Sequence, residues 1–160
     1  MPVTSATSLL VDVEPSPTAG AIARGTQRLL ASLGLACVSE LPLASGRRAD
    51  LVAIGGDGEV WIIEIKSSIA DFRADHKWPD YRRHCDRLFF ATGPHVSAAI
   101  FPSDAGLIIA DGFGGLLERD APVHRLHSAT RRNVLLTFAR AAALRLQAAA
   151  DPAGRYDGAG

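Results

Sequence analysis

Two long helical patterns enclose a series of apolar runs that have the length of strands. From Ala19 to Leu33, apolar residues recur at helical spacing, and Gly34 is typical of the position after a helix. The segment Ser128–Ala149 is predicted to be a second, longer helix. Its apolar stripe, which we expect to face the core, consists of Val134, Leu135, Phe138, Ala142 and Leu146.

The strands are predicted from short runs of β-forming residues bounded by Gly, Pro and Asp. The main runs are Leu35–Leu43 (ending at Pro42), Arg47–Ile54, Glu59–Ser68, Arg87–Thr92 and Gly106–Asp111. Short edge pieces are expected at Leu116–Glu118 and Val123–Leu126. The order of helices and strands predicts an α/β fold, a mixed central sheet flanked by helices.

The polar segments between the strands are expected to form short helices. Ser68 suits the N-cap of a helix, with Asp71 three residues further on. The densely polar segment Ala70–Asp86 predicts a pair of surface helices broken at Pro79, and His95–Phe101 predicts another short helix.

Length and composition indicate one soluble globular domain, which we place at residues 19–149. Residues 1–18 are rich in Ser, Thr and Pro, and residues 150–160 are rich in Gly, so both segments are expected to be disordered. No signal peptide or membrane-spanning run is evident. Cys37 and Cys85 have no zinc-site spacing, which favours reduced thiols in a cytoplasmic protein.

The clearest chemical signal lies in the two strands that flank the turn Gly55–Gly58. Glu64 and Lys66 are two residues apart and share one face of their strand. An antiparallel return brings Asp50 beside them. Two carboxylates and an ammonium suit a Mg²⁺ ion that binds phosphate and activates water. A salt bridge at a strand end explains the same spacing, and spacing alone does not decide between the two interpretations.

Other polar residues are candidates for the same site or for DNA contacts. Glu40 is a candidate additional carboxylate. The candidate DNA contacts are Arg47, Arg48, Lys77, Tyr81, Arg82, Arg131 and Arg132. The last two belong to a segment, 121–150, that has five arginines and no Asp or Glu. A solvated helix face would account for this asymmetry equally well.

Several of these runs resemble a known family. Asp50 followed by Glu64-Ile65-Lys66 is similar to the motif of the PD-(D/E)XK nuclease superfamily. The wider set resembles the MmcB-like DNA repair proteins. This set comprises Arg47–Leu51, Glu64–Ser68, Asp71–Asp75, Lys77-Trp78, Tyr81, Cys85-Asp86, Phe101-Pro102, Gly106–Ile108 and Arg131-Arg132.

The resemblance implies a restriction-endonuclease-like core and a cytoplasmic role in DNA repair. It implies that Asp50, Glu64 and the Ile65 carbonyl hold Mg²⁺ or Mn²⁺ and that Lys66 positions water. Glu40 would correspond to the upstream acid of the superfamily, which usually lies on the first helix rather than on a strand. Partners implied by the resemblance are DNA, a second copy of the chain and another repair protein.

Three functional hypotheses follow. The first is a metal-dependent deoxyribonuclease that hydrolyses phosphodiester bonds. The second is a non-catalytic DNA-binding module on a nuclease scaffold, and the third is an RNA-processing nuclease.

Overall fold

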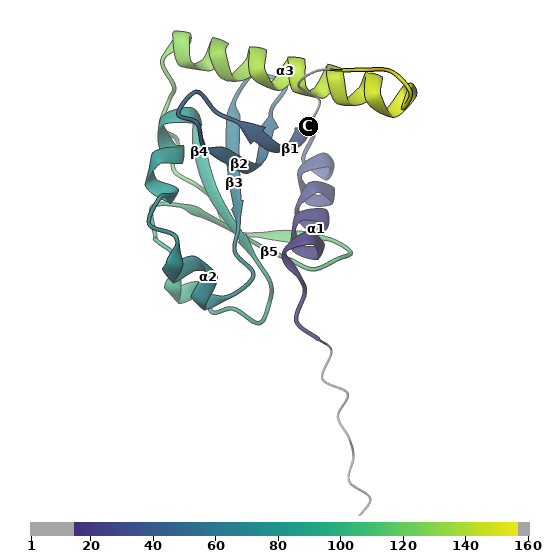
Figure 1. Ribbon diagram of the computed structural model, residues 1–160. Helices are drawn as coiled ribbons and strands as arrows, with labels where there is room; N and C mark the ends of the chain where they lie inside the picture. The colour runs from purple at the N-terminus through teal and green to yellow at the C-terminus, as the bar shows by residue number, and fades with distance from the viewer. Residues whose placement is uncertain (1–14, 157–160) are drawn as a thin grey trace, which may run out of the picture.

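A single six-stranded mixed sheet forms the centre of the molecule, with helices on both faces (Figure 1). The computed structural model describes residues 15–156. Its helices are α1 (Ala19–Ser32), α2 (Ile69–Ala74), α3 (Ser128–Ala150) and the 3₁₀ segments η1 (Trp78–His84) and η2 (Ala98–Ile100). Its strands are β1 (Ala36–Pro42), β2 (Arg48–Ile54), β3 (Val60–Ile65), β4 (Arg87–Thr92), β5 (Gly106–Ala110) and β6 (Gly115–Arg119).

The strands lie in the sheet in the same order as in the sequence, from β1 to β6. β1, β2 and β3 form an antiparallel meander, because tight turns join them. β4 runs parallel to both β3 and β5, and β6 returns antiparallel to β5. The predicted α/β fold with a mixed sheet is therefore confirmed.

Each face of the sheet packs against a different helix, as the alternation of side chains along the strands requires. Ile22 and Leu30 of α1 pack in a cluster with Ile63 of β3. Val134 of α3 lies in the cluster on the other face, with Ile62 of β3. In Figure 1, α3 lies across the β1–β2 end of the sheet, and α1 stands beside it.

A buried ion pair attaches the start of α3 to the sheet. Asp86, 2% exposed, accepts two hydrogen bonds of 2.7 Å from the guanidinium of Arg131. Its carboxylate also accepts the amides of Val60 and Leu126. Burial alone would raise the pKa of Asp86, but these hydrogen bonds outweigh burial and lower the pKa to about 2.

Three local predictions were wrong, and the extent of a fourth was overestimated. Pro79 does not break a helix, because it lies in the first turn of η1 and the chain leaves α2 earlier, at Asp75. Residues 123–126 form no strand but an extended loop whose Leu126 amide bonds to Asp86. The helix expected over 95–101 is only the short η2. Leu146 is 72% exposed, because it lies outside the helix face that meets the sheet.

The expected leader falls mostly outside the described residues, and so do residues 157–160 of the expected tail. Cys37 and Cys85 are both free thiols, as expected. Among the described helices, none combines the length and the apolar character that crossing a membrane requires.

Candidate active site

The strands β2 and β3 separate at one end of their hairpin, and two acidic side chains occupy the fork. Their ladder ends at the pair Leu51–Ile63, so Asp50 and Glu64 are the next residues to face each other. The amide of Asp50 donates to Oε1 of Glu64 at 3.1 Å, and the amide of Ile65 donates to Oδ2 of Asp50 at 2.8 Å. The two carboxylates thus replace the missing rungs of the ladder, as the predicted antiparallel return requires.

The fork places both acids where ionisation is unfavourable. Burial raises the pKa of Asp50 above its ordinary value, against the opposing effect of the Ile65 amide. Glu64 is 3% exposed, and burial, followed by repulsion from Asp50, raises its pKa to about 8. Acids with pKa values raised in this way do not stabilise the folded protein. They are typical of functional sites, where a raised pKa serves the chemistry.

Lys66 lies one residue beyond the end of β3, and its ammonium binds an acid outside the fork. Nζ of Lys66 lies 2.6 Å from Oδ2 of Asp75, and the two side chains are 8% and 17% exposed. Asp75 is itself held by the amide of Lys77, which donates to Oδ1 at 2.8 Å. Burial opposes ionisation of Asp75, but the hydrogen bonds from Lys66 and Lys77 prevail and lower its pKa. Asp75 therefore fixes the position of the Lys66 ammonium.

The segment that carries Asp75 is anchored by predictable local chemistry. Oγ of Ser68 accepts the amide of Asp71, and Oδ2 of Asp71 accepts the amide of Ser67, so the predicted cap of α2 is present. Phe72 packs on the rings of Phe90 and Phe101. These contacts position α2, so that the side chain of Asp75 just after it meets Lys66.

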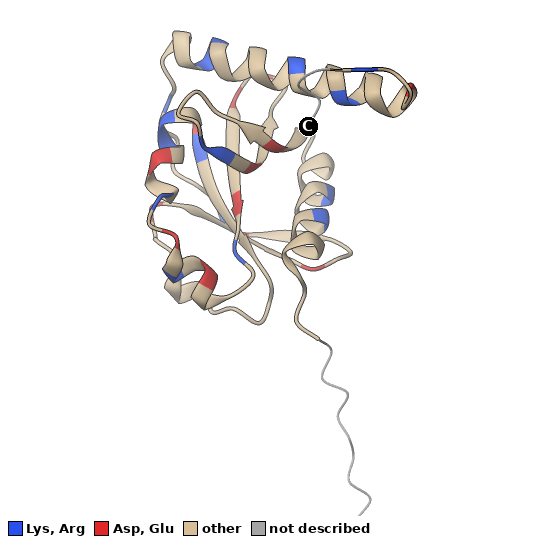
Figure 2. Cartoon of the chain, viewed as in Figure 1, with Lys and Arg blue, Asp and Glu red and all other residues tan. Residues whose placement is uncertain are grey.

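The fork opens into a cleft of about 740 Å³ between α1 and the α2–η1 segment. The α1 side is lined by small residues and then by Arg24 and Gln27, and the floor carries Asp50, Glu64 and Lys66. Tyr81 closes the far side, and its hydroxyl donates to the carbonyl of Arg48. Figure 2 shows acidic positions on the strands between these helical segments. The cleft thus combines room for a ligand with concentrated charge.

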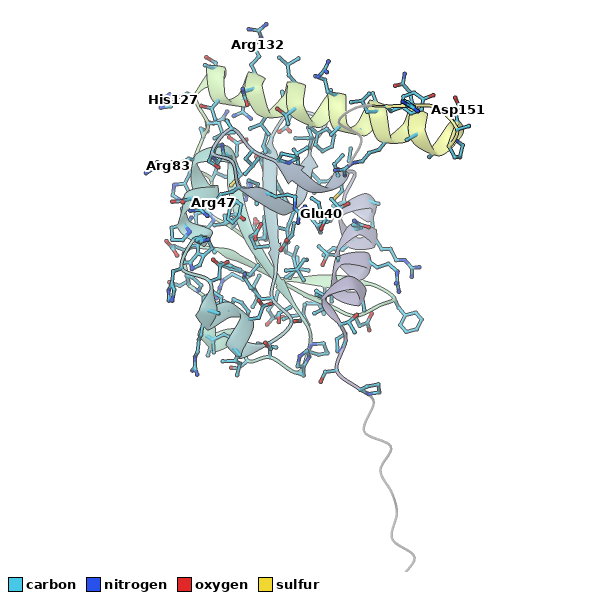
Figure 3. All side chains as sticks on the ribbon, viewed as in Figure 1. Glu40, Arg47, Arg83, His127, Arg132 and Asp151 are labelled. Carbon is cyan, nitrogen blue, oxygen red and sulfur yellow. The ribbon has the colours of Figure 1, made fainter. Side chains whose placement is uncertain are left out.

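Glu40 lies on the rim of this cleft, although it belongs to β1. Its φ of +50° reverses the alternation of side chains along β1, and its side chain faces α1 (Figure 3). Arg145 of α3 donates to the carbonyls of Ser39 and Glu40, which supports this irregular backbone. The carboxylate is exposed and lies 3.9 Å from Arg48. Glu40 is therefore a neighbour of the fork and not part of it.

Five of the seven predicted DNA contacts lie near the cleft or in its wall, in three groups. Arg48 and Lys77 are exposed close to the cleft. Arg47 and Arg82 are half-buried in ion pairs, with Asp80 at 2.7 Å and Asp104 at 2.9 Å. Tyr81 is buried in the cleft wall.

The two remaining candidates lie on α3, away from the cleft. The guanidinium of Arg131 bonds Asp86 and the carbonyl of Gly58, so it anchors α3 to the sheet. Arg132 is exposed and points away from the sheet (Figure 3). The charge asymmetry of residues 121–150 suggests DNA contact for both, but it does not separate an arginine held in an ion pair from an exposed one.

Sequence reasoning missed Asp75, Arg24 and Gln27. The first lies in a segment where acids, bases and aromatics are so dense that no single partner for Lys66 stands out. Arg24 and Gln27 are three residues apart and so share one face of α1, which is a detectable signal. The sequence pattern does not show, however, that this face of α1 lies opposite the β2–β3 hairpin.

The donor set of the fork fits a hard divalent cation that keeps most of its water. Among residues 15–156, no cluster of three or more His, Cys, Asp or Glu side chains is arranged to hold a metal. Two carboxylates with adjacent oxygens remain, and both carry raised pKa values that a cation would lower. Mg²⁺ is commonly held by one or two carboxylates together with water and substrate phosphate.

Comparisons with known proteins agree with this architecture. A sequence profile described as DNA repair protein MmcB-like matches residues 6–153. A solved structure, described as a protein of unknown function from Silicibacter pomeroyi, is 41% identical. The match covers 91% of this chain and 97% of that chain, with a TM-score of 0.83. None of the curated proteins compared with the chain matches it.

Proposed function

The chain belongs to the MmcB-like family of DNA repair proteins, and we propose that it is a metal-dependent deoxyribonuclease that hydrolyses phosphodiester bonds. The observation that carries the proposal is the pairing of Asp50 and Glu64 across the fork, with Lys66 buried beside them at the floor of a cleft. A structural role alone does not account for a buried acid beside a half-buried one, because their burial is unfavourable without a counter-charge.

Asp50 and Glu64 would hold Mg²⁺ or Mn²⁺, with the Ile65 carbonyl as a third oxygen. When bound, such an ion lowers the pKa of water and neutralises charge on a phosphoryl group. The chain's own contribution is to hold both carboxylates adjacent in a site where burial raises their pKa values, so that a bound cation would favour their ionised forms.

Lys66 is proposed to orient the attacking water or a phosphate oxygen through its ammonium. Asp75 keeps that ammonium at one position, so a substrate phosphate would meet a charge that is already in place. Asp75 is thus a positioning residue, and Lys66 a catalytic one.

DNA would approach the cleft between α1 and η1. Arg24 on one wall and Arg48 and Lys77 near the opposite side would contact phosphates without reading bases. Glu40 on the rim would stay solvated, close to Arg48.

The experiment is a cleavage panel of single-stranded, flapped, mismatched and branched DNA, with matched RNA, in Mg²⁺ and in Mn²⁺. We expect the wild type to cleave at least one DNA substrate and Asp50→Asn to cleave none. Glu118→Gln, an exposed acid on β6, is the control and should cleave normally. Chelation of the metal should abolish cleavage by the wild type.

The panel also separates the alternatives. Salt-sensitive DNA binding with no cleavage of any substrate would favour the non-catalytic DNA-binding module. Preferential cleavage of RNA would favour the RNA-processing nuclease. Equal cleavage by the wild type and Asp50→Asn would refute the proposed site.

A further inference from the structure

The outward face of α3 carries an apolar seam that no described element covers. Its apolar positions are Leu136, Ala139, Ala143, Leu146 and Ala150, spaced alternately by three and four residues, and Arg132 precedes them in the same register. All six are exposed, and Leu136 and Leu146 are exposed by 52% and 72%. This spacing is that of the a and d positions in helices that pack against another helix.

The seam lies beside two hollows in the surface. A hollow of about 610 Å³ follows the first half of α3 and is lined by Leu126, Leu135 and Leu136. A second, of about 650 Å³, borders the second half and is lined by Leu35, Cys37 and Leu146. Side chains projecting from a neighbouring helix would find recesses next to the seam at both ends.

The charge of α3 restricts what can lie on it. Residues 121–150 contain no Asp or Glu, and Arg132 and Arg140 are both exposed beside the leucines. Figure 2 shows basic positions along α3 and an acidic one only beyond its end. A second copy of α3 would bring the same cations against these, whichever direction it ran, and would supply no counter-charge. DNA would satisfy the arginines but not Leu136 and Leu146.

We propose that this face of α3 docks an amphipathic helix of another protein, with a Leu-type apolar seam flanked by Asp or Glu. The partner's apolar residues would cover Leu136 and Leu146, and its acids would pair with Arg132 and Arg140. The seam on α3 itself shares no residue with the walls of the candidate active site, although Gln27 and Ser39 line both the cleft and the second hollow. The proposal therefore does not depend on nuclease activity.

The test measures binding of two synthetic helical peptides to the full chain. Each peptide is three heptads long. Both peptides carry Leu at a and d; one carries Glu at e and g, and the other carries Lys. Like charges keep each peptide from pairing with itself. Fluorescence anisotropy should show saturable binding of the Glu peptide and no binding of the Lys peptide.

Variants locate the binding. Leu136→Asp and Leu146→Asp should each weaken binding of the Glu peptide by about tenfold or more. Leu116→Asp, on β6 and also 52% exposed, should bind as the wild type does. Circular dichroism verifies that all three variants are folded.

Other outcomes would overturn the proposal. These are failure of the Glu peptide to bind at concentrations up to about 1 mM, or equal binding by the seam variants and the wild type. A dimer in sedimentation that only the seam variants dissociate would assign the face to a second copy. Loss of oligonucleotide binding in the same variants would assign it to DNA.

Discussion

The amide of Asp50 donates to Oε1 of Glu64 at 3.1 Å, so the two acids are joined across the point where β2 and β3 part. The paired residues of β2 and β3 end at Leu51–Ile63. Because the strands separate there, the amide of Asp50 needs an acceptor other than the backbone of β3. Two carboxylates, one buried and one half-buried, replace backbone pairing here, and the resulting fork is the floor of the cleft. Burial of two acids opposes stability at this place.

The first prediction concerns Glu64→Gln, which keeps the oxygen that accepts the Asp50 amide but removes the charge. Because Glu64 is buried beside a second acid, the variant should unfold at a higher temperature than the metal-free wild type at pH 7.5, with a gain of about 1–3 kcal/mol. The same variant should show no cleavage. Differential scanning calorimetry in chelator measures the first effect.

Glu118→Gln is the matched control, because its carboxylate is exposed on β6. It should change stability by less than about 0.5 kcal/mol. A Glu64→Gln protein that is less stable than the wild type would mean that the buried charge is already compensated.

The second prediction concerns Asp75→Asn. The amide side chain can still accept the Lys77 amide, but it gives Lys66 no counter-charge. Cleavage at saturating DNA should fall by about a hundredfold, with a smaller change in DNA affinity, because positioning of Lys66 matters after binding. Single-turnover rates over a range of enzyme concentration separate the two effects.

Asp120→Asn removes a more exposed ion pair, with Arg87, and should leave the rate unchanged. Partial recovery of the rate in Asp75→Glu would support positioning by charge. A rate in Asp75→Asn equal to the wild type would show that Lys66 needs no such partner.

The third prediction is the loss of stability in acid through Asp86. Its pKa in the folded protein is lowered to about 2, from an ordinary value of 3.8. A lowered carboxyl pKa stabilises the folded state above the ordinary pKa, and this stabilisation is lost as the pH falls through the folded value. The free energy of unfolding should therefore drop by roughly 2 kcal/mol between about pH 4 and pH 2 through this group.

Urea unfolding at several pH values measures this slope. Asp86→Asn should be much less stable at pH 7, by about 3–5 kcal/mol, because Arg131 loses its partner, and it should lack this part of the slope. If that variant does not fold, Arg131→Lys, which keeps the charge but not the paired contact, should show a reduced slope. An unchanged acid slope in whichever variant folds would argue against the anchor.

The fourth prediction concerns Arg24 on the α1 wall of the cleft. Arg24→Ala should weaken DNA binding. It should also reduce the slope of log affinity against log salt concentration by about 1, because one phosphate contact is lost. Arg28→Ala is the control, because Arg28 is committed to the carbonyl of Phe113. Equal salt slopes in the wild type and Arg24→Ala would mean that Arg24 of α1 does not contact DNA.

Local periodicity predicted most of this fold, because strand and helix patterns depend on neighbours in the sequence. The hairpin, the Ser68 cap and the strand Arg87–Thr92 all follow from such patterns. The pairing of Asp50 with Glu64 was also predictable, since one short turn sets the register of both strands.

Contacts between distant segments could not be predicted in the same way. The Lys66–Asp75 pair depends on how α2 folds back, and the Arg131–Asp86 pair joins residues 45 positions apart. Leu146 matched a helical stripe, but it lies outside the face of α3 that meets the sheet and is 72% exposed. Periodicity identifies which residues share one face of a helix, but it does not identify the element that packs against that face.

Binding of Mn²⁺ to the full chain, followed by electron paramagnetic resonance, tests the central claim most directly, because it needs no knowledge of the substrate. The fork should bind Mn²⁺ saturably in the wild type and in Glu118→Gln, and binding should be lost in Asp50→Asn and in Glu64→Gln. Absence of saturable binding in the wild type, or equal binding in all four proteins, would contradict the account.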